Sequence, residues 1–581
     1  MERRVLLAIF LCFLVIYLWQ ALFVKPVPKP GGSTTTATPT AATARPAQSP
    51  GQAKEAPITT PPPTISPGAE ALVGETSERD VRVETDNVIA VFTNRGGRLK
   101  SWRLKRYEDD HREPLELVAN DLPADQPLPF SLRVPDAAQS TTLNGALYSV
   151  KESSSADSHG TNVTFEYRDT AGLHALKRFQ LEPKSYILTF ESSVASGDHA
   201  LAPAIEWGPG MGGPDDTVAR NRSRFGYAPR ALLSAGGKEQ RITAANLAKP
   251  PTYEDNFAYA GIDVHYFMSV AFAPGRVKVR YQGLTVPQPV EGANATARDL
   301  MAYTIDPGPS VQPIKFYIGP KDFDELASID ANFVRAVDFG MFSFLVVPLL
   351  RSLVWIYGYV HNYGWSIVVL TVIINLLILP LRHKSVVAMR KMQEIQPEAK
   401  AIQDRYAKMK ATDPARQKMN QELMDLYKQR GVNPAGGCIP MLLPFPLLFA
   451  FYSLLTTAIE LRGAPFVLWI RDLTAPDPYY VFPILMGASQ LWQQWIMPAA
   501  GVDPTQRRIG MVMPIVFMFL FISYPSGMAV YFLVTNVWAI GQQYFTNYLI
   551  GPPTIRSVRP AAERRAKSIG SGKTAAAQGD R

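Results

Sequence analysis

The sequence predicts a polytopic α-helical membrane protein that carries a large all-β domain outside the membrane. Two observations predict this fold class. Six apolar segments are long enough, or nearly so, to cross a bilayer, and none of them contains Asp, Glu, Lys or Arg. Between the first two segments, about 245 residues show the apolar–polar alternation of half-buried strands. The 581-residue chain is therefore expected to divide between membrane and water.

The first apolar segment, Val5 to Val24, would be about 30 Å long as a helix and follows Glu2-Arg3-Arg4. It is longer than the apolar core of most signal peptides, and no A-x-A cleavage site follows it. We interpret residues 1–24 as an uncleaved signal anchor. Residues 25–78 are rich in Pro, Thr, Ala and Ser, a composition that buries too little apolar surface to fold, and are expected to form a disordered tether.

The β domain is predicted for residues 79–325. Runs such as VRVETDNVIAVFTN and SYILTFESSV alternate as strands do, and Gly, Pro, Asp and Asn separate them. The segment is too large for one small barrel, so a sandwich of two sheets fits it best.

The helical region begins with an apolar stretch that Pro348 and Arg351 interrupt, so residues 326–362 are expected to form an interfacial amphipathic helix. The remaining parts then follow in order. They are a second span at 363–381, a cytoplasmic helical hairpin at 382–431, a third span at 432–459, an outer loop at 460–478, a fourth span at 479–497, a cytoplasmic loop at 498–508, the fifth and sixth spans within 509–550, and a basic cytoplasmic tail at 551–581.

Charge in the loops predicts the orientation of the spans. Residues 382–430 hold twelve Lys and Arg against six Asp and Glu, and the tail holds seven against two. Such loops remain in the cytoplasm, whereas loop 460–478 has no basic excess and is expected outside. Both termini are then cytoplasmic. The segment from about 25 to 362 is periplasmic if the host is a Gram-negative bacterium.

The cytoplasmic hairpin has apolar residues at helical spacing. Pro414 follows Asp413 as a first-turn proline after an N-cap, so a second helix is expected to begin there and return antiparallel to the first. The seam between the two helices is expected to contain Met392, Ile395, Ile402, Met409 and Met419.

Asn375 is an unusual residue, since it places an amide near the middle of an otherwise apolar span. It could hydrogen-bond to a neighbouring span and only hold helices together, a contribution of roughly 0.5–2 kcal/mol. Alternatively it faces a hydrated cavity. Thr371 lies one turn earlier and shares its face, which favours the cavity slightly.

The spans lack the groups that chemistry or ion coupling would need. They contain no acid–base pair and no relay of carboxylates, and the sequence has no nucleotide-binding loop or metal-ligand cluster. We therefore expect no catalytic residue, no cofactor and no metal, and no enzymatic activity. A solute transporter is a rival interpretation. Internal repeats would support it, and the sequence shows none. A membrane-anchored glycan-binding protein is another.

Three segments carry a resemblance to a known family. They read VNPAGGCIPMLLPFPLLFAFYSLL, ELRGAPFVLWIRDLTAPDPYYVFPILMG and YPSGMAVYFLVTNVWAIGQQ. They resemble the YidC membrane protein insertases of bacteria, whose relatives are the Oxa and Albino insertases. The resemblance is dense over about 325–550 and weaker over the β domain. It implies a five-helix insertase core with a hydrophilic groove open to the cytoplasm and to lipid, and a periplasmic β-supersandwich similar to sugar mutarotases.

The resemblance also implies where substrates bind. The family's groove usually carries an arginine in the second span, and here Asn375 occupies that place. The implied groove residues are Thr371, Asn375, Tyr531, Phe532 and Asn536. A hydrophobic wall along which substrate helices slide would map to Leu448, Met486 and Leu520. Without the arginine, we expect a working groove that is less selective for acidic tails, with Arg382 and His383 supplying attraction at its mouth.

The partners that the resemblance implies are nascent membrane proteins, subunits of the Sec translocon and membrane lipids, and the hairpin is expected to help recruit substrates. The basic tail could also contact ribosomal RNA or anionic lipid. Its charge is equally compatible with a simple marker of cytoplasmic location.

Overall fold

The computed structural model describes residues 70–550, apart from gaps at 110, 120–121, 123–125, 155–159, 213–226, 288–296, 309–312, 407–414, 432–443 and 497–503. The predicted anchor, the tether up to residue 69 and the basic tail lie outside the described residues.

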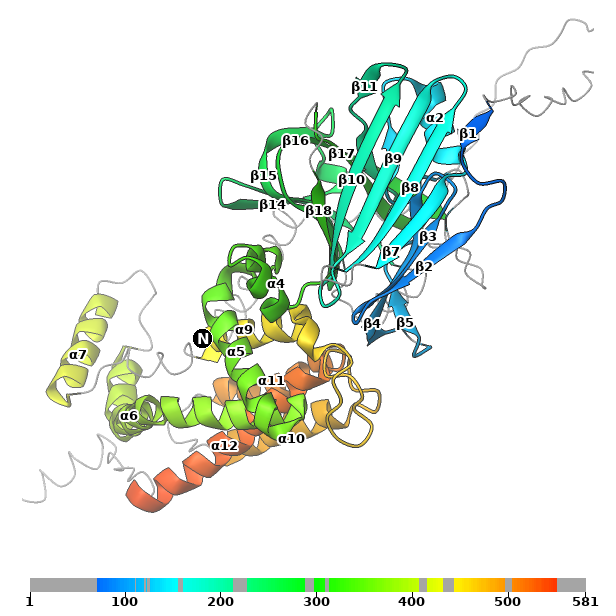
Figure 1. Ribbon diagram of the computed structural model, residues 1–581. Helices are drawn as coiled ribbons and strands as arrows, with labels where there is room; N and C mark the ends of the chain where they lie inside the picture. The colour runs from blue at the N-terminus through cyan, green and yellow to red at the C-terminus, as the bar shows by residue number, and fades with distance from the viewer. Residues whose placement is uncertain are drawn as a thin grey trace, which may run out of the picture. The chain divides into compact units, whose positions relative to one another are not determined.

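Within the described residues, the larger sheet of the β domain has fourteen antiparallel strands, and its main path runs β1-β8-β9-β10-β18-β16-β15-β13-β14. Figure 1 shows β8, β9 and β10 as long neighbouring strands. Along this path the strands are β1 (Ala71–Val73), β8 (Thr161–Asp169), β9 (Leu173–Leu181), β10 (Ile187–Ser196), β18 (Ile314–Pro320), β16 (Phe267–Pro287), β15 (Thr252–Asp263), β13 (Arg230–Ala235) and β14 (Lys238–Thr243). The others are β6 (Ser131–Arg133), β7 (Ser149–Ser154), β11 (His199–Leu201), β12 (Ala204–Trp207) and β17 (Ala297–Asp306).

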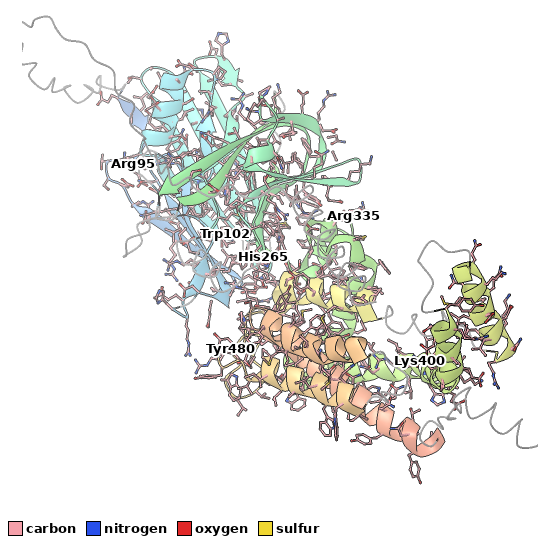
Figure 2. All side chains as sticks on the ribbon, turned by 180° about the vertical axis from the view of Figure 1, so that it is seen from behind. Arg95, Trp102, His265, Arg335, Lys400 and Tyr480 are labelled. Carbon is pink, nitrogen blue, oxygen red and sulfur yellow. The ribbon has the colours of Figure 1, made fainter. Side chains whose placement is uncertain are left out.

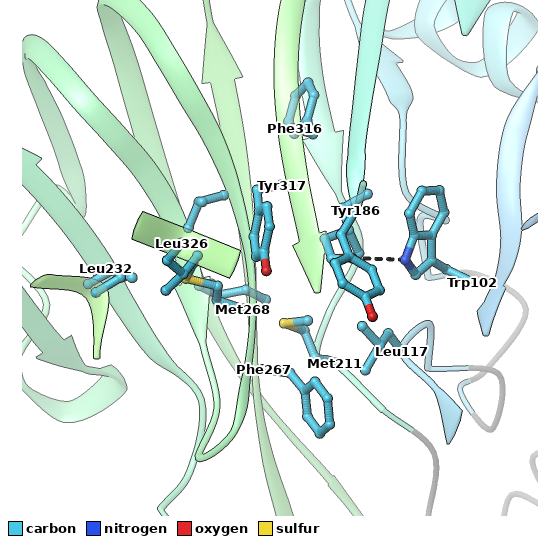
Figure 3. Packing of buried hydrophobic residues seen from close by; sticks show 14 of the residues in the cluster. Trp102, Leu117, Tyr186, Met211, Leu232, Phe267, Met268, Phe316, Tyr317 and Leu326 are labelled. Carbon is cyan, nitrogen blue, oxygen red and sulfur yellow. Dashed lines mark hydrogen bonds between the residues drawn. The ribbon is translucent and has the colours of Figure 1, made fainter. Parts of the chain in front are cut away.

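The smaller sheet has four strands in the order β2 (Asp80–Glu84), β3 (Val88–Thr93), β4 (Arg98–Glu108) and β5 (Pro114–Glu116). Alternation along β2 buries Val81 and Val83 and leaves Asp80 and Arg82 exposed, as a strand with one covered face requires. The Trp102 indole N–H of β4 donates to the Ile318 carbonyl of β18 at 2.9 Å (Figure 3). This hydrogen bond joins the two sheets inside their shared core.

The β domain also buries a group of charges. Asp263 at the end of β15 accepts hydrogen bonds from Arg230 at 3.0 Å, from Lys321 at 3.1 Å and from the Tyr227 hydroxyl at 2.9 Å. Burial alone would raise the pKa of Asp263, but Lys321 and Arg230 outweigh it and hold this pKa below its usual value. Burial lowers the pKa of Lys321 to about 8, although Asp263 opposes the shift.

The N-terminal boundary of the β domain differs from the prediction. Residues 71–73 lie within the predicted tether, but they form β1, which pairs antiparallel with β8 at Asp169. Glu75 and Arg79 also form an ion pair at 2.8 Å. The strand is only three residues long and is held by backbone pairing, so composition gives no sign of it.

The helical region contains seven helices of at least fourteen residues within the described residues. They are α5 (Ser343–Val360), α6 (Tyr363–Arg405), α7 (Ala415–Gln429), α9 (Pro444–Thr457), α10 (Val481–Ile496), α11 (Pro504–Phe521) and α12 (Ser526–Ile550). Shorter helices are α2 (Ala137–Gly145), α4 (Phe323–Ile329) and the 3-10 turns η1 (Ala244–Asn246), η2 (Phe333–Ala336), η3 (Gly340–Phe342) and η5 (Ile459–Leu461).

Two helices among the described residues are long and apolar enough to cross a membrane, at Gly340–Val360 and Tyr363–His383. The first coincides with the segment predicted to lie at the interface. Its face with Val346, Leu350 and Leu353 is buried, whereas Arg351 is exposed and its guanidinium stacks on the Phe323 ring at 5.3 Å.

The second span does not end where the sequence suggested. Residues 363–381 and the first half of the predicted hairpin form one helix of 43 residues, α6, despite Pro380 and Pro397. The Asn362 side chain caps its start by accepting from the Trp365 N–H at 3.1 Å. The change from apolar to charged residues near 382 is therefore not a break in the helix.

Candidate functional site

The polar face of α6 lies inside the helical bundle. Thr371 is fully buried, and its hydroxyl donates to the Ile367 carbonyl at 2.6 Å. Asn375 is 4% exposed, and its amide donates to the Thr371 carbonyl at 2.8 Å. Both donated bonds stay within α6, one turn back along the helix. The interpretation of Asn375 as a hydrogen-bonded link to another span therefore gains no support from the described hydrogen bonds.

The predicted groove residues of α12 contact three different helices. The Tyr531 ring stacks on Phe451 of α9 with 4.2 Å between centroids, and Phe532 meets Phe521 of α11 edge-on at 5.0 Å. Asn536 is buried and donates from its amide to the Ser489 hydroxyl of α10 at 3.0 Å. The structure thus brings Tyr531, Phe532 and Asn536 into the bundle, and among the described hydrogen bonds Asn536 has an interhelical partner and Asn375 does not.

A cation lies further along the face of α6 that carries Asn375. Arg382 follows Asn375 by seven residues, which is two helical turns, and is half-buried. Arg382 therefore lies on the same helix face as Asn375, two turns further along α6.

The three residues predicted to form a hydrophobic slide differ in their surroundings. Leu520 on α11 is 48% exposed, Leu448 on α9 is half-buried against the core, and Met486 on α10 is completely buried. The Met486 carbonyl also accepts from Asn536 at 3.4 Å. Met486 is therefore no surface for a substrate in this conformation. The resemblance assigns Met486 to the slide, but it does not determine which face of α10 packs against a neighbouring helix.

The loop at 460–478 closes one end of the bundle. Asp477 is buried and accepts hydrogen bonds from the Trp469 indole at 2.9 Å and from the Phe482 N–H at 2.8 Å, so it caps α10. The Gly527 N–H of α12 donates to the Leu473 carbonyl at 3.0 Å. A Cβ on Gly364 of α6 would lie 2.0 Å from the Phe466 ring, so only glycine permits this approach.

Glu460, at the start of this loop, is a buried carboxylate whose pKa is raised. Its Oε1 accepts from the Phe323 N–H at 3.2 Å, while its buried Oε2 has no hydrogen-bond partner among the described residues. Burial, and to a lesser degree the nearby carboxylate of Asp322, raises the pKa of Glu460 to about 7.

The predicted hairpin seam is present where residues are described. Ile395 and Ile402 of α6 are buried, and Met392 and Met419 are half-buried. Met409 and Pro414 lie outside the described residues. Ion pairs join Glu398 to Arg430 at 2.7 Å and Arg405 to Glu422 at 3.2 Å. These pairs run in opposite directions along α6 and α7, so the two helices are antiparallel. Lys400 lies on this part of α6 (Figure 2).

Sequence reasoning missed an apolar groove between α6 and α12, with a volume of about 640 Å³. Its lining includes Val368 and Val372 of α6 and Val537 of α12. Two buried donors of α12 also line it, the Trp538 indole N–H and the Gln542 amide, and neither has a hydrogen-bond partner among the described residues. The spacing of these two residues, one helical turn, is the only signal that could have indicated them. In the described part of the chain, no group of three or more His, Cys, Asp and Glu could hold a metal ion.

Known proteins match this chain over most of its length. The family model of the 60Kd inner membrane protein matches residues 355–551, and that of the YidC periplasmic domain matches residues 80–352. The "Membrane protein insertase YidC" of Geotalea daltonii is 32% identical over 555 residues, which cover 94% of this chain and 99% of the relative.

The chain belongs to the YidC membrane protein insertase family. The YidC of Oleidesulfovibrio alaskensis is 34% identical over 84% of this chain and 90% of that one. A crystal structure of an active YidC insertase with its first transmembrane domain resolved is similar over 82% of this chain and 95% of that one, at 17% identity and a TM-score of 0.33. The family identification drawn from the three sequence segments is thus confirmed, as is the pairing of a periplasmic β-sandwich with a helical inner-membrane part.

Proposed function

We propose that this chain inserts and folds integral membrane proteins in the bacterial inner membrane, alone or together with the Sec translocon. The observation that carries the proposal is the buried polar face of Thr371 and Asn375 in the otherwise apolar first half of α6. Both residues are buried in this conformation, but the hydrogen bonds that they donate stay inside α6, so separation of the helices would expose this face to a polar substrate segment without breaking those bonds. Membership of the family supports the same function.

The proposed topology has six spans with both termini in the cytoplasm. The anchor at 1–24 is the first span, and α6, α9, α10, α11 and α12 form the five-helix core around the groove. We place α5 at the interface because its exposed Arg351 would otherwise lie within hydrocarbon. Residues of about 25–362 are then periplasmic, and loop 460–478 seals the groove on that side.

The groove acts by shortening the path of the polar flank of a substrate. A nascent span gains free energy by entering lipid, about 25 cal/mol per Å² of apolar surface, so no nucleotide is needed. The barrier is the transfer of the polar flank across about 30 Å of hydrocarbon. A polar cavity that reaches Asn375 from the cytoplasm removes part of that distance, and the substrate leaves sideways past Leu520.

Asn375 and Arg382 have different roles in this proposal. The neutral amide hydrates a passing tail without attracting it from a distance, and it avoids the roughly 2.5–3.5 kcal/mol that a cation costs at the centre of a span. Arg382, two turns nearer the cytoplasm, attracts acidic tails to the mouth. The hairpin of α6 and α7 recruits substrates, and the basic tail contacts the ribosome or anionic lipid.

A depletion-and-rescue experiment tests the groove. A bacterium depleted of its own insertase would express this chain or its variants, and insertion of two single-span substrates, one with an acidic and one with a neutral tail, would be scored. Asn375→Leu should impair both substrates because it removes the buried polar group. Leu377→Val, on the exposed side of the same helix, is the matched control and should rescue fully, because it keeps an apolar side chain toward lipid. Full rescue by Asn375→Leu would overturn the proposal.

A second variant in the same experiment introduces the arginine of the family pattern at position 375. Asn375→Arg should improve insertion of the acidic-tailed substrate relative to the neutral one, because a cation deep in the groove attracts the tail. An unchanged ratio of the two substrates would mean that charge at this position plays no part.

A further inference from the structure

The apolar groove between α6 and α12 has the length of an acyl chain. The two helices pack side by side (Figure 1), and the groove between them has a volume of about 640 Å³. On α6 it extends from Val368 to Leu379, which is about 16 Å along the helix axis. The hydrocarbon of one leaflet of a bilayer is about 15 Å thick. The groove is therefore about as long as one leaflet is deep.

Gly541 of α12 leaves part of the groove open. It belongs to the groove lining and is exposed, and a Cβ added to it would meet no neighbouring atom within 4 Å. The space beside Gly541 is thus not filled by another side chain of the described residues, and a longer residue at this position would occupy it.

Two donors in the groove lining lack an acceptor. The Trp538 indole N–H and the Gln542 amide are buried and have no hydrogen-bond partner among the described residues. They lie one helical turn apart, on the same face of α12. Unpaired donors are costly inside a bilayer, where water does not reach them. An alkyl chain accepts no hydrogen bond, so these donors favour an occupant that carries oxygen as well as an apolar chain.

The two helices run in the same direction from the loop at 460–478. The Gly527 N–H of α12 and the N-cap side chain of α6 donate to carbonyls of this loop, at 3.0 and 3.1 Å. A Cβ on Gly527 would also lie 3.5 Å from the Ile367 side chain of α6. Gln542 is fifteen residues beyond Gly527, and Arg382 is fifteen residues beyond Ile367. The two unpaired donors therefore lie toward the end of the groove at which the basic residues of α6 begin.

This end of the groove is basic. His383 follows Leu379 by one helical turn, so it continues the face of α6 that lines the groove, and it stands between Arg382 and Lys384 in the sequence. Neither α12 nor residues 363–393 contain Asp or Glu. The charge at this end therefore favours an anionic group.

We propose that this groove binds one phospholipid with an anionic headgroup. An acyl chain lies between α6 and α12, the ester carbonyls accept from Trp538 and Gln542, and the phosphate lies beside His383. The groove is apolar, then carries donors, then is basic, and a phospholipid presents its chain, its esters and its phosphate in the same order. The leaflet rests on the proposed function, because the topology given there places the basic end, and hence the headgroup, on the cytoplasmic side.

Native mass spectrometry of the purified full-length chain in detergent tests the site. The probe is phosphatidylglycerol, and the reference lipid is phosphatidylcholine with the same acyl chains, which has no net charge. Phosphatidylglycerol should be retained more tightly. Gln542→Leu and Trp538→Phe each remove one donor and should each weaken retention about fivefold. Gln543→Leu is the matched control and should bind as the unaltered chain does, because Gln543 is outside the described lining and donates to Asn547 at 3.2 Å.

A second variant fills the groove and keeps both donors. Gly541→Leu places its side chain in open space, so it should abolish retention while the melting temperature stays unchanged. Equal retention of phosphatidylglycerol by the unaltered chain, Gln542→Leu and Gly541→Leu would overturn the proposal, and equal retention of the two lipids would overturn the anionic headgroup. Displacement of the lipid by an equimolar apolar single-span peptide would also overturn it, since the groove would then be a surface for substrate. The measurement needs no insertion activity, so its failure is distinct from failure of Asn375 variants in the rescue experiment.

Discussion

Removal of the Asp263 carboxylate should strongly destabilise the β domain. Asp263 is completely buried, and its Oδ2 accepts from Arg230, Lys321 and Tyr227 at 2.9–3.1 Å. In Asp263→Ala, Lys321 loses its only ion-pair partner among the described residues, and Arg230 keeps only its longer contact with Asp338 at 3.7 Å. Breaking a buried pair in this way costs about 3–5 kcal/mol. For a domain of this size, such a loss lowers the melting temperature by about 6–20 °C.

Thermal unfolding followed by circular dichroism in the β region, on the full-length chain in detergent, measures this loss. The control is Glu191→Ala, which breaks an exposed ion pair with Arg178 and should cost less than about 1 kcal/mol. A double variant, Asp263→Leu with Lys321→Met, should recover part of the stability because it removes one of the unpaired charges. A shift for Asp263→Ala no larger than that for Glu191→Ala would refute the reasoning.

Two further predictions concern the helical region. The pKa of Glu460 is about 7 in the folded state against 4.5 for an ordinary Glu, so the folded state binds the extra proton between these values and stability falls as pH rises through this window. At pH 8, Glu460→Gln should therefore increase the free energy of unfolding by up to about 3 kcal/mol and so raise the melting temperature. At pH 5 it should hardly change either quantity. The same gain at both pH values would contradict this reasoning. Asn536→Leu should cost about 0.6–2 kcal/mol in detergent unfolding, because it removes the bond to Ser489 on another helix. Thr535→Val is its control, since the Thr535 hydroxyl donates only within α12, and an equal loss in both variants would count against an interhelical role.

The sequence was most informative where one face of an element is buried. Alternation along β2 predicts which residues enter the core, because the side-chain period of a strand is two whatever the strand pairs with. The family was likewise predictable from three segments. β1 was not, since a three-residue edge strand is held by backbone hydrogen bonds that composition does not encode.

The candidate site was predictable in its residues and not in its contacts. Asn375 and Asn536 are the same residue type in similar apolar helices, yet one amide bonds within its helix and the other bonds to α10. The difference depends on which face of each helix meets a neighbour. One sequence does not determine how each helix is rotated about its axis. For the same reason, Met486 is predicted to lie on the substrate slide but is buried, whereas Leu520 is exposed.

The helix α6 is continuous, but it contains two prolines at which it can bend. Pro380 and Pro397 each leave one carbonyl of the preceding turn without its usual donor, so the helix is most compliant at these points. The segment between them is about 25 Å long, so a rotation of 10° at Pro380 would displace its far end by about 4 Å. Because Pro380 leaves the carbonyl of Leu376 without its usual donor, bending at Pro380 would change the backbone directly after Asn375. A movement of the hairpin relative to the first half of α6 would therefore reach the backbone beside the polar face.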